Sequence, residues 1–534
     1  MPSNGHNNGH SSNGPFCRVD SRHLSAEELS ETLDVLLASQ NQQGDTAQFP
    51  GLVQLLDGVS KVNPHQHITG SVGSRDLLER VIGIYQLDSD ARSAFLDYVA
   101  SRRILAEDEL GGFFLQSQEE LFRWFEVHIP LPGDPDDFKE ADDRLGLVRL
   151  AFQSDHDSSL ELLKEAYRTV AMENMAHGVT EVWFRTSLGD HESDAFIDAA
   201  KVALEGAGAV NEDAGIPISI RFLVGMRKHY PTGVSQVDPN IPTDARAEDL
   251  VSAVSELRER TPGARVMLLG IDSVGMDSHW RPEWQASARS AALKSKFHVA
   301  VHFGESWHEG ELVTRLEMLY DLVKHGVIHQ LDNANALFAV KDLMCPHQAY
   351  SNDEWAEIRR LQRGIFETLA DRGIALGINP TSNDLLTRSL RRREGWRFRA
   401  LTEPLAVGQA SVVDLMLGAY HRHRPLVIVV GNDNSRLYPA RIAGSFLTVS
   451  EELANLWDAP GSTYFSVYGK LSTEIIAQLI RNGFMLSQSA NDGGDKSLLQ
   501  PRVISARSPQ LSVSSVLEYP HVKAPNPEQT NGLH

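Results

Sequence analysis

The stretch that decides the fold is "HVAVHFGESWHEGELVTRLEMLYDLVKHGVIHQLD", residues 298–332. It opens with a short run rich in valine and closes with a second short apolar run. Between them, residues 309–326 repeat apolar side chains at helical spacing. A strand, a helix and a second strand in this order form a unit whose strands run parallel. The stretch therefore predicts an α/β protein with a parallel sheet.

The same alternation recurs along the chain, with long amphipathic stretches such as residues 247–261 between short runs. Eight such runs are rich in β-branched or apolar residues: "KVNPHQH" (61–67), "VTEVWFR" (179–185), "ISIRFLVGM" (218–226), "RVMLLGID" (265–272), "HVAVHFGE" (298–305), "GVIHQLD" (326–332), "IALGINP" (374–380) and "PLVIVVGND" (425–433). Eight alternating strand and helix units predict a (β/α)8 TIM barrel.

One connection is much longer than the others. Residues 68–178 separate the first two runs and hold several helical patterns, among them residues 74–85 and 160–176. A barrel tolerates insertions of this size in its connections. We therefore expect a helical insertion after the first strand.

Both ends of the chain differ in composition from the rest. Residues 1–20 are rich in Gly, Asn and Ser, and residues 493–534 are rich in proline and polar side chains. Such segments bury little apolar area, so we expect disordered tails at both ends, the second of them mostly disordered. Residues 21–492 are then assigned to one barrel domain.

Composition excludes several classes of protein. The formal net charge of −21 argues against a nucleic-acid binder, which needs a basic face. Two cysteines, Cys17 and Cys345, are too few for a disulfide framework and indicate a reducing compartment such as the cytoplasm. We find no apolar run of 18 residues and no secretory signal pattern, and expect neither a membrane span nor secretion. The sequence leaves the oligomeric state open.

Ionisable residues gather at the predicted ends of four strands. Two histidines spaced by two residues point to the same face of a strand, and the carboxyl ends of barrel strands form the active-site rim. A pair of this kind arises by chance, and a lone histidine on an apolar strand usually belongs to the core. Strands one, five, six and eight, however, all contribute: His65, His67, His302, Glu305, His329 and Asp433. This set predicts a metal site that suits zinc or another imidazole-binding ion.

These residues resemble motifs of the adenosine/AMP deaminase family of the amidohydrolase superfamily over roughly residues 55–490. The motifs occur in the family's order: "HQHITGS" (65–71), "GIDSVGMD" (270–277), "HFGE" (302–305), "NPTSN" (379–383), "NDN" (432–434) and "LSTEIIAQLIRNGFMLS" (471–487). The resemblance implies a metal-dependent hydrolase that removes an amino group from a cyclic amidine by means of a metal-activated water, in purine metabolism.

The resemblance also implies a role for each matching residue. One Zn²⁺ per chain, or another divalent transition ion, would be bound by the ligands His65, His67, His302 and Asp433. Asp433 would also take part in catalysis, Glu305 would be the general acid, and His329 would orient and deprotonate the water. His67 would also face the substrate. Gly275 would offer its backbone N–H to a ring nitrogen of the substrate.

Two positions in the substrate region depart from the family's motifs. Thr69 stands where the family has the aspartate that contacts ribose, and Asn434 stands where it has the second aspartate of T-D-D. An asparagine amide still donates a hydrogen bond to a ring nitrogen. These changes put plain adenosine in doubt as the substrate, although both positions stay candidates for substrate binding.

An arginine-rich segment follows the seventh strand, within an expected loop insertion of residues 384–424. Six arginines lie in twelve residues: Arg388, Arg391, Arg392, Arg393, Arg397 and Arg399. Arginines bind phosphate or carboxylate in a bidentate manner, which favours an anion-binding lid and an anionic substrate. The alternatives are a solvated helix face or arginines that pair with an acidic protein, and on an acidic chain these alternatives are strong.

Three functions remain in competition. The first is a deaminase of a purine nucleoside, a purine nucleotide or a related aminoheterocycle. The second is a metallohydrolase of the same fold that cleaves a different C–N bond, in an amide or a substituted amine. The third is a barrel that binds a nucleoside without catalysis, which would predict the loss of a catalytic group.

Overall fold

The computed structural model describes most of the barrel and its neighbouring helices, and every structural statement below concerns these residues. They are residues 19–41, 56–130, 138–153, 156–186, 193–214, 218–227, 243–260, 268–274, 292, 294–305, 311–325, 328–341, 350–380, 383, 426–433, 442, 445–446 and 464–491.

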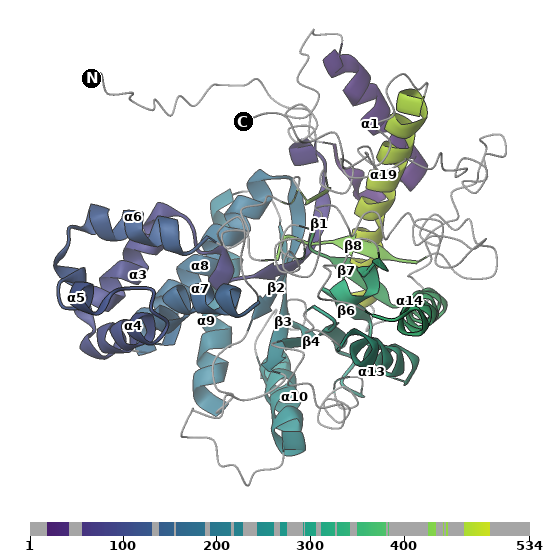
Figure 1. Cartoon of the computed structure of the whole chain (residues 1–534). Helices are drawn as coiled ribbons and strands as arrows, with labels where there is room; N and C mark the ends of the chain where they lie inside the picture. The colour runs from purple at the N-terminus through teal and green to yellow at the C-terminus, as the bar shows by residue number, and fades with distance from the viewer. Residues whose placement is uncertain are drawn as a thin grey trace, which may run out of the picture.

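Eight parallel strands form a single sheet in which each strand pairs with the next one along the chain (Figure 1). The strands are β1 (Lys61–His67), β2 (Val179–Thr186), β3 (Ser219–Arg227), β4 (Leu268–Val274), β5 (His298–His302), β6 (Gln330–Asp332), β7 (Ala375–Ile378) and β8 (Ile428–Val430). Each lies within or beside one of the eight predicted runs. The predicted (β/α)8 TIM barrel is therefore confirmed.

The barrel closes where the end of β8 meets the end of β1. The backbone N–H of His67 donates to the carbonyl oxygen of Asp433 at 2.9 Å, and the N–H of Asp433 donates to the carbonyl oxygen of His65 at 3.0 Å. Gln66 and Asp433 also form a parallel bridge. Two of the predicted metal-site segments thus form the seam of the barrel.

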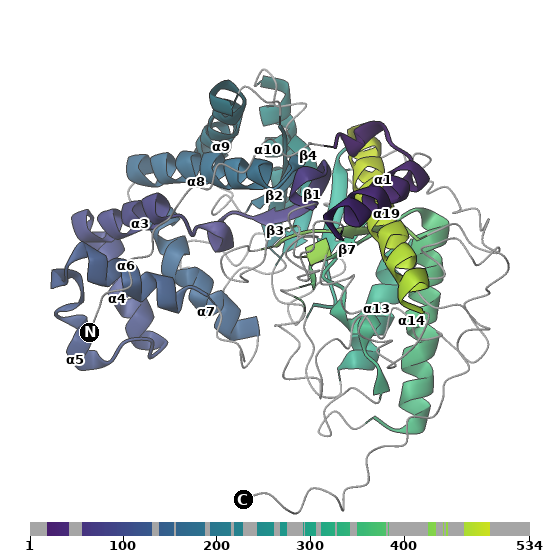
Figure 2. The same ribbon diagram turned by 90° about the horizontal axis from the view of Figure 1, so that it is seen from above.

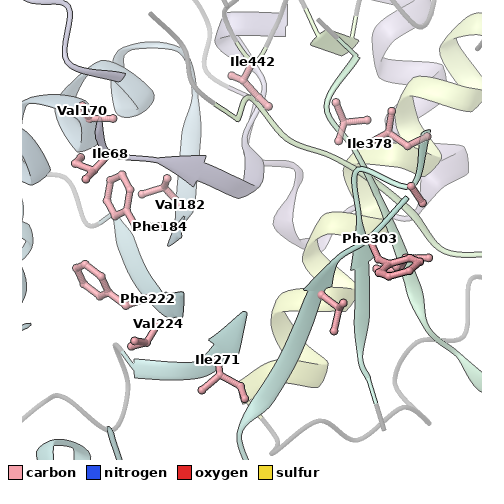
Figure 3. Close-up of a cluster of buried hydrophobic side chains, with 14 of the residues drawn as sticks. Ile68, Val170, Val182, Phe184, Phe222, Val224, Ile271, Phe303, Ile378 and Ile442 are labelled. Atoms are coloured by element: carbon pink, nitrogen blue, oxygen red, sulfur yellow. The ribbon is translucent and has the colours of Figure 1, made fainter. Parts of the chain in front are cut away.

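Side chains alternate between the two faces of each strand. Outward residues such as Phe184, Val224 and Ile271 pack against the helices in the large outer core (Figure 3). Inward residues such as Trp183 and Ala300 fill the barrel together with residues of the last helix. The same alternation points the polar residues near the carboxyl ends of the strands into the barrel.

Long helices cover the outside of the sheet: α8 (His156–Ala176), α9 (Ser193–Ala214), α10 (Thr243–Arg260), α13 (Leu312–His325), α14 (Asn352–Arg372) and α19 (Tyr464–Asn491). The ends of α14 show why the chain folds locally in this way. Ser351 and Glu354 form a capping box at its start, and Gly373 ends it in a left-handed conformation with φ of 59°. Helix α1 (Ala26–Asn41) lies against α19 (Figure 2).

A helical lobe stands to one side of the barrel between β1 and β2 (Figures 1 and 2). Its helices are α3 (Arg75–Leu87), α4 (Ser89–Ser101), α5 (Glu107–Leu110), α6 (Gln118–His128) and α7 (Phe138–Arg149), and it leads into α8. Buried aromatic rings, including those of Tyr85, Phe95 and Phe125, form its centre. These helices occupy the segment in which the sequence predicts a helical insertion.

In the part of the chain that the structure describes, short 3-10 helices connect the longer elements: η1 (Ser21–His23), η2 (Thr69–Ser71), η3 (Phe113–Leu115), η4 (Leu150–Gln153) and η6 (Asn335–Phe338). Helix η2 leaves the end of β1, and η6 follows β6.

The predicted tails lie mostly outside the described residues, and so does the arginine-rich segment from Arg388 to Arg399. Two residues that the sequence assigns to the first tail are structured. Val19 forms a parallel bridge with Val59, and the side chain of Asp20 caps η1. The domain bounds otherwise stay predictions. Within the described residues, no helix combines the length and the apolar character that a bilayer span requires.

Candidate metal centre

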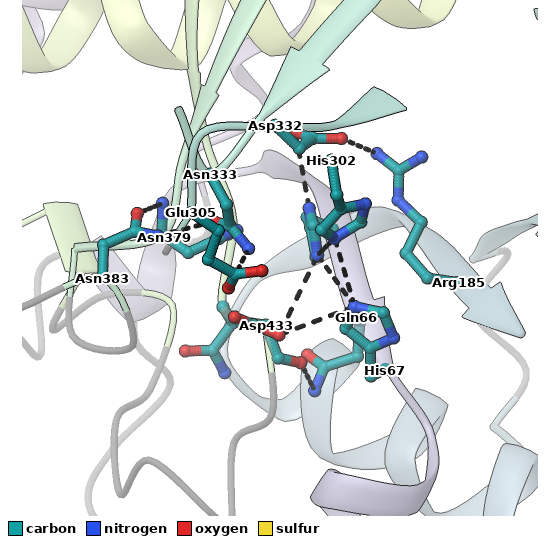
Figure 4. Close-up of polar contacts among 12 residues, drawn as sticks. Gln66, His67, Arg185, His302, Glu305, Asp332, Asn333, Asn379, Asn383 and Asp433 are labelled. Carbon is teal, nitrogen blue, oxygen red and sulfur yellow. Dashed lines mark hydrogen bonds and ion pairs between the residues drawn. The ribbon is translucent and has the colours of Figure 1, made fainter. Parts of the chain in front are cut away.

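Three histidines converge at the carboxyl ends of β1 and β5 (Figure 4). The Nε2 atoms of His65 and His67 lie 3.1 Å apart, and the Nε2 atom of His302 lies 3.1 Å from the first and 3.4 Å from the second. His65 and His67 meet because residues two apart on a strand share a face. His302 joins them because it is the last inward residue of β5. The structure thus brings together three of the four predicted ligands.

The fourth predicted ligand, Asp433, reaches the same place from the end of β8. Its Oδ1 atom lies 3.6 Å from Nε2 of His67 and 3.9 Å from Nε2 of His65. Asp433 is buried and has a left-handed backbone with φ of 52°, which is strained for a residue other than glycine. Its backbone bonds to β1 hold it there, and strain of this kind gathers at functional sites.

The geometry of this group fits a metal ion. Zinc binds imidazole nitrogens at about 2.0–2.1 Å in a tetrahedron, which places two ligand nitrogens about 3.3–3.4 Å apart. The three observed separations are 3.1, 3.1 and 3.4 Å. Three imidazole nitrogens cannot all satisfy one another by hydrogen bonds, because each neutral ring carries a single N–H. The donor set therefore suits a divalent, imidazole-binding transition ion.

The ionisation of two of the three histidines is consistent with this use. Burial, followed by the charge of neighbouring groups, lowers the pKa of His65 and His67 well below the ordinary value, so both rings stay neutral. Burial opposes protonation of His302 as well. There, the charge of Asp272 and its hydrogen bond outweigh burial and raise the pKa of the ring.

Two buried carboxylates stand behind the histidines. Oδ1 of Asp272 lies 3.0 Å from Nδ1 of His302, and Oδ1 of Asp332 lies 3.4 Å from Nδ1 of His65. The Asp272 contact fixes the tautomer that leaves Nε2 of His302 for a metal. Burial opposes ionisation of Asp272, but His302 and Arg185 outweigh it and lower the pKa of this carboxyl.

Glu305 lies just beyond His302 and is buried. Gly304 turns the chain with φ of 79°, a conformation that favours glycine. Oε1 of Glu305 accepts a hydrogen bond from Nδ2 of Asn333 at 3.0 Å. The other end of that amide, Oδ1 of Asn333, accepts from Nδ2 of Asn379 at 2.6 Å and from Nδ2 of Asn383 at 2.8 Å. The orientation of the Asn333 amide is therefore fixed, with its N–H group toward Glu305.

The structure does not bring His329 to this cluster. The register pairs His302 with Asp332, so that Asp332 ends β6 at the rim and His329 precedes the strand. Three residues of strand put His329 about 10 Å toward the amino end. There its ring stacks on His298, and its Nδ1 atom accepts from the N–H of Val299 at 3.0 Å. The rim position of β6 is occupied by Asp332, and the catalytic role of His329 stays a prediction.

The predicted substrate-binding residues have different outcomes. The side chain of His67 is 23% exposed, against 1% for His65, so His67 is the more accessible ligand. Thr69 lies at the start of η2, directly after β1, and is partly buried. Gly275 and Asn434 lie outside the described residues.

Sequence reasoning missed four residues of this site: Asp272, Asp332, Arg185 and Asn333. Strand alternation could have found Arg185, because it lies two residues after the inward-facing Trp183. It could not have found Asp332, because the sequence does not show whether His329 or Asp332 ends the strand. Asn333 gave no signal of its own, because its role depends on contacts with distant segments.

No protein-family model matches the sequence, and no curated protein does. Among solved structures, an Arabidopsis protein named ADAL in complex with IMP is 14% identical, with a TM-score of 0.45 and coverage of 82% of this chain and 99% of that one. An Arabidopsis N6-mAMP deaminase is 16% identical, with a TM-score of 0.43 and coverage of 80% and 98%. An amidohydrolase from Burkholderia ambifaria with bound Zn is 13% identical, with a TM-score of 0.42 and coverage of 79% and 94%. At TM-scores this low, the likeness decides neither the family nor the substrate of this chain.

Proposed function

We propose that this chain is a metal-dependent hydrolase that removes an amino group from a purine nucleoside, a purine nucleotide or a related aminoheterocycle. The observation that carries the proposal is the convergence of three imidazole nitrogens and the Asp433 carboxylate at the carboxyl ends of the barrel strands. This is the end at which barrel enzymes place their chemistry. A buried carboxyl group, Glu305, stands next to the cluster.

Each residue of the site would have a distinct chemical role. His65, His67, His302 and Asp433 would hold a divalent ion, which when bound makes water a nucleophile at neutral pH. Asp433 is the carboxylate placed to accept a proton at this point. Glu305 is placed to donate a proton to a ring nitrogen of the substrate. Because Asn333 donates to Oε1 of Glu305, the proton that Glu305 delivers would be carried on Oε2.

One observation favours a second candidate, a metallohydrolase that cleaves an amide or a substituted amine. The rim end of β6 carries Asp332, which is paired with Arg185, and no histidine that could shuttle a proton to a leaving amine. Thr69 after β1 also departs from the aspartate that binds ribose in the family that the sequence resembles. A leaving group that departs without a proton shuttle would suit this arrangement.

Ammonia release by the zinc-loaded protein tests the proposal. The panel contains adenosine, deoxyadenosine, AMP, adenine, guanine and N6-substituted purines, with Asp433→Ala as the blank. We expect release from at least one purine and none from the blank. Preference for AMP would support the arginine-rich segment as an anion-binding lid. Amine release from N6-substituted purines alone would favour the second candidate. Silence across the panel, in protein shown to hold metal, would contradict the proposed deaminase.

A further inference from the structure

Arg185 is a fully buried cation inside the barrel, on β2 beside the histidine cluster (Figure 4). Its Nη2 atom lies 2.9 Å from Oδ2 of Asp332, and its Nη1 atom lies 3.4 Å from Oδ2 of Asp272. Nη2 also donates to the carbonyl oxygen of Pro64 at 2.9 Å. One guanidinium therefore joins two carboxylates and the backbone of β1.

Each of these carboxylates faces a different ligand histidine. Asp272 contacts Nδ1 of His302 at 3.0 Å, and Asp332 lies 3.4 Å from Nδ1 of His65. Partners of this kind set the tautomer and the ring orientation of a metal-binding histidine. The chain of contacts runs from His302 through Asp272, Arg185 and Asp332 to His65, so Arg185 is the link between two ligands from two strands.

The neighbours of Asp332 keep it in this position. Nε2 of Gln330 donates to its Oδ1 atom at 2.9 Å. Gly377 on β7 leaves the space that the carboxylate fills, because a Cβ atom at this position would lie 1.7 Å from Oδ1 of Asp332. The absence of a side chain at Gly377 thus makes room for the Asp332 carboxylate, which Arg185 binds.

Asp272, His302 and Asp332 also form a group that could by itself hold a cation. Two buried carboxylates without a positive charge between them would be costly. In this chain the guanidinium supplies that charge permanently. Its planar fork can serve both carboxylates at once, which the single nitrogen of a lysine cannot do.

We infer that Arg185 is a positioning residue of the metal centre. This inference rests on the proposed function, because it requires that a metal binds at His65, His67 and His302. The guanidinium is a fixed cation between Asp272 and Asp332. It holds both carboxylates so that they orient His302 and His65, and it takes the place of a second metal ion.

The test compares Arg185→Met with Arg221→Met as a matched control. Arg221 is a buried arginine on the neighbouring strand β3, where it pairs with Glu181 at 3.9 Å, away from the histidines. The readouts are zinc affinity by competition with a chromogenic chelator, metal content per chain, and the visible absorption spectrum of the Co²⁺-loaded protein, which reports ligand geometry.

We expect one ion per chain in the wild type. Arg185→Met should weaken zinc binding by about 10- to 100-fold and shift the Co²⁺ bands, as loss of a partner behind a metal ligand usually does. Arg185→Lys should retain part of the affinity, because it keeps the charge but loses the fork. Arg221→Met should leave both the affinity and the spectrum as in the wild type.

Unchanged affinity and spectrum in Arg185→Met would overturn the inference, as would equal losses in Arg221→Met or two ions per chain in the wild type. If Arg185→Met does not fold, Arg185→Lys and Asp332→Asn carry the same comparison, and wild-type affinity in both would overturn it. A wild type that binds no metal would also remove the proposed function. If the wild type binds metal and the variants bind it equally well, only the role of Arg185 is contradicted.

Discussion

At the scale of single residues, a motif predicts that His329 lies at the rim of the barrel, whereas the strand register places it elsewhere. Its imidazole is buried beside His298 at the amino end of β6, away from the rim. We therefore expect His329→Gln to keep kcat/KM within about threefold, because the ring does not reach the cluster. Stability should fall by about 1–3 kcal/mol, since the buried N–H of Val299 loses its acceptor. Steady-state kinetics and urea unfolding check both effects. A loss of activity of about 100-fold in a folded variant would support the catalytic role of His329.

Asn333 offers a second prediction at this scale. Asn333→Asp keeps the acceptor that binds Asn379 and Asn383 but replaces the N–H group that faces Glu305 with a carboxylate oxygen. The new negative charge favours the protonated form of Glu305. If Glu305 acts as an acid, activity is lost as pH rises and the proton leaves. We therefore expect the alkaline limb of the pH–activity profile to move to higher pH, and kcat/KM to fall about 10- to 100-fold through misplacement of Glu305.

The matched control for this variant is Asn335→Asp. The side chain of Asn335 donates to the backbone oxygen of Glu305, whereas that of Asn333 donates to its carboxylate. An equal shift of the alkaline limb in both variants would show that any added charge nearby has the same effect, and Asn333 would lose its specific role.

Much of the candidate site follows from residues that the sequence displays. The pair His65 and His67 needs only strand alternation, and His302 needs only the end of a valine-rich run. The run "GVIHQLD" holds both His329 and Asp332, and the sequence does not show which of them ends the strand. The contact between Arg185 and Asp332 spans 147 positions and depends on packing that no local pattern records.

At the scale of elements, one buried phenol joins two helices of the helical lobe. Tyr85 of α3 packs against Phe95 and Phe125 and donates a hydrogen bond to the carbonyl oxygen of Leu147 on α7 at 2.8 Å. Burial raises the pKa of Tyr85 above the ordinary value of about 10. The folded lobe therefore favours the neutral phenol. This stabilisation is complete below about pH 10 and is lost as pH rises above it.

We expect Tyr85→Phe to destabilise the protein by about 0.5–1.5 kcal/mol near neutral pH, because the hydrogen bond to α7 is lost. The variant should also show a smaller drop in Tm between about pH 8 and about pH 11 than the wild type does, since no buried phenol remains to ionise. Thermal unfolding followed by circular dichroism measures both. Tyr320→Phe on α13 makes the same chemical change outside the lobe. If the two variants lose the same part of the alkaline drop, Tyr85 has no special place in it.

The elements themselves were largely readable from the chain. Eight apolar runs and the amphipathic stretches between them give the strands and the covering helices, because the period of a pattern is a local property. The arrangement of α3 to α7 as a lobe beside the barrel was not readable. It depends on contacts such as the one between Tyr85 and Leu147, which join segments 62 positions apart.

At the scale of the whole molecule, the metal centre ties together parts of the chain that are distant in sequence. His67 and His302 are 235 positions apart, and Gln66 bonds to Asp433 across 367 positions. An ion held by β1, β5 and β8 would bind only the folded barrel. Metal binding would therefore add to the stability of the fold, by about 4 kcal/mol when free metal exceeds the Kd a thousandfold.

We expect chelator-treated protein to unfold at a lower temperature than zinc-loaded protein, and the difference to grow with free zinc. Hydrogen exchange should localise the gain, because the ion joins strand ends while the lobe shares none of its ligands. Protection should rise in β1, β5 and β8 and stay unchanged in α4 and α5, which serve as the internal control. His65→Ala removes a ligand and should abolish the zinc dependence of Tm. A Tm that ignores zinc in the wild type, or protection gained equally by barrel and lobe, would contradict a metal that closes the seam between β8 and β1.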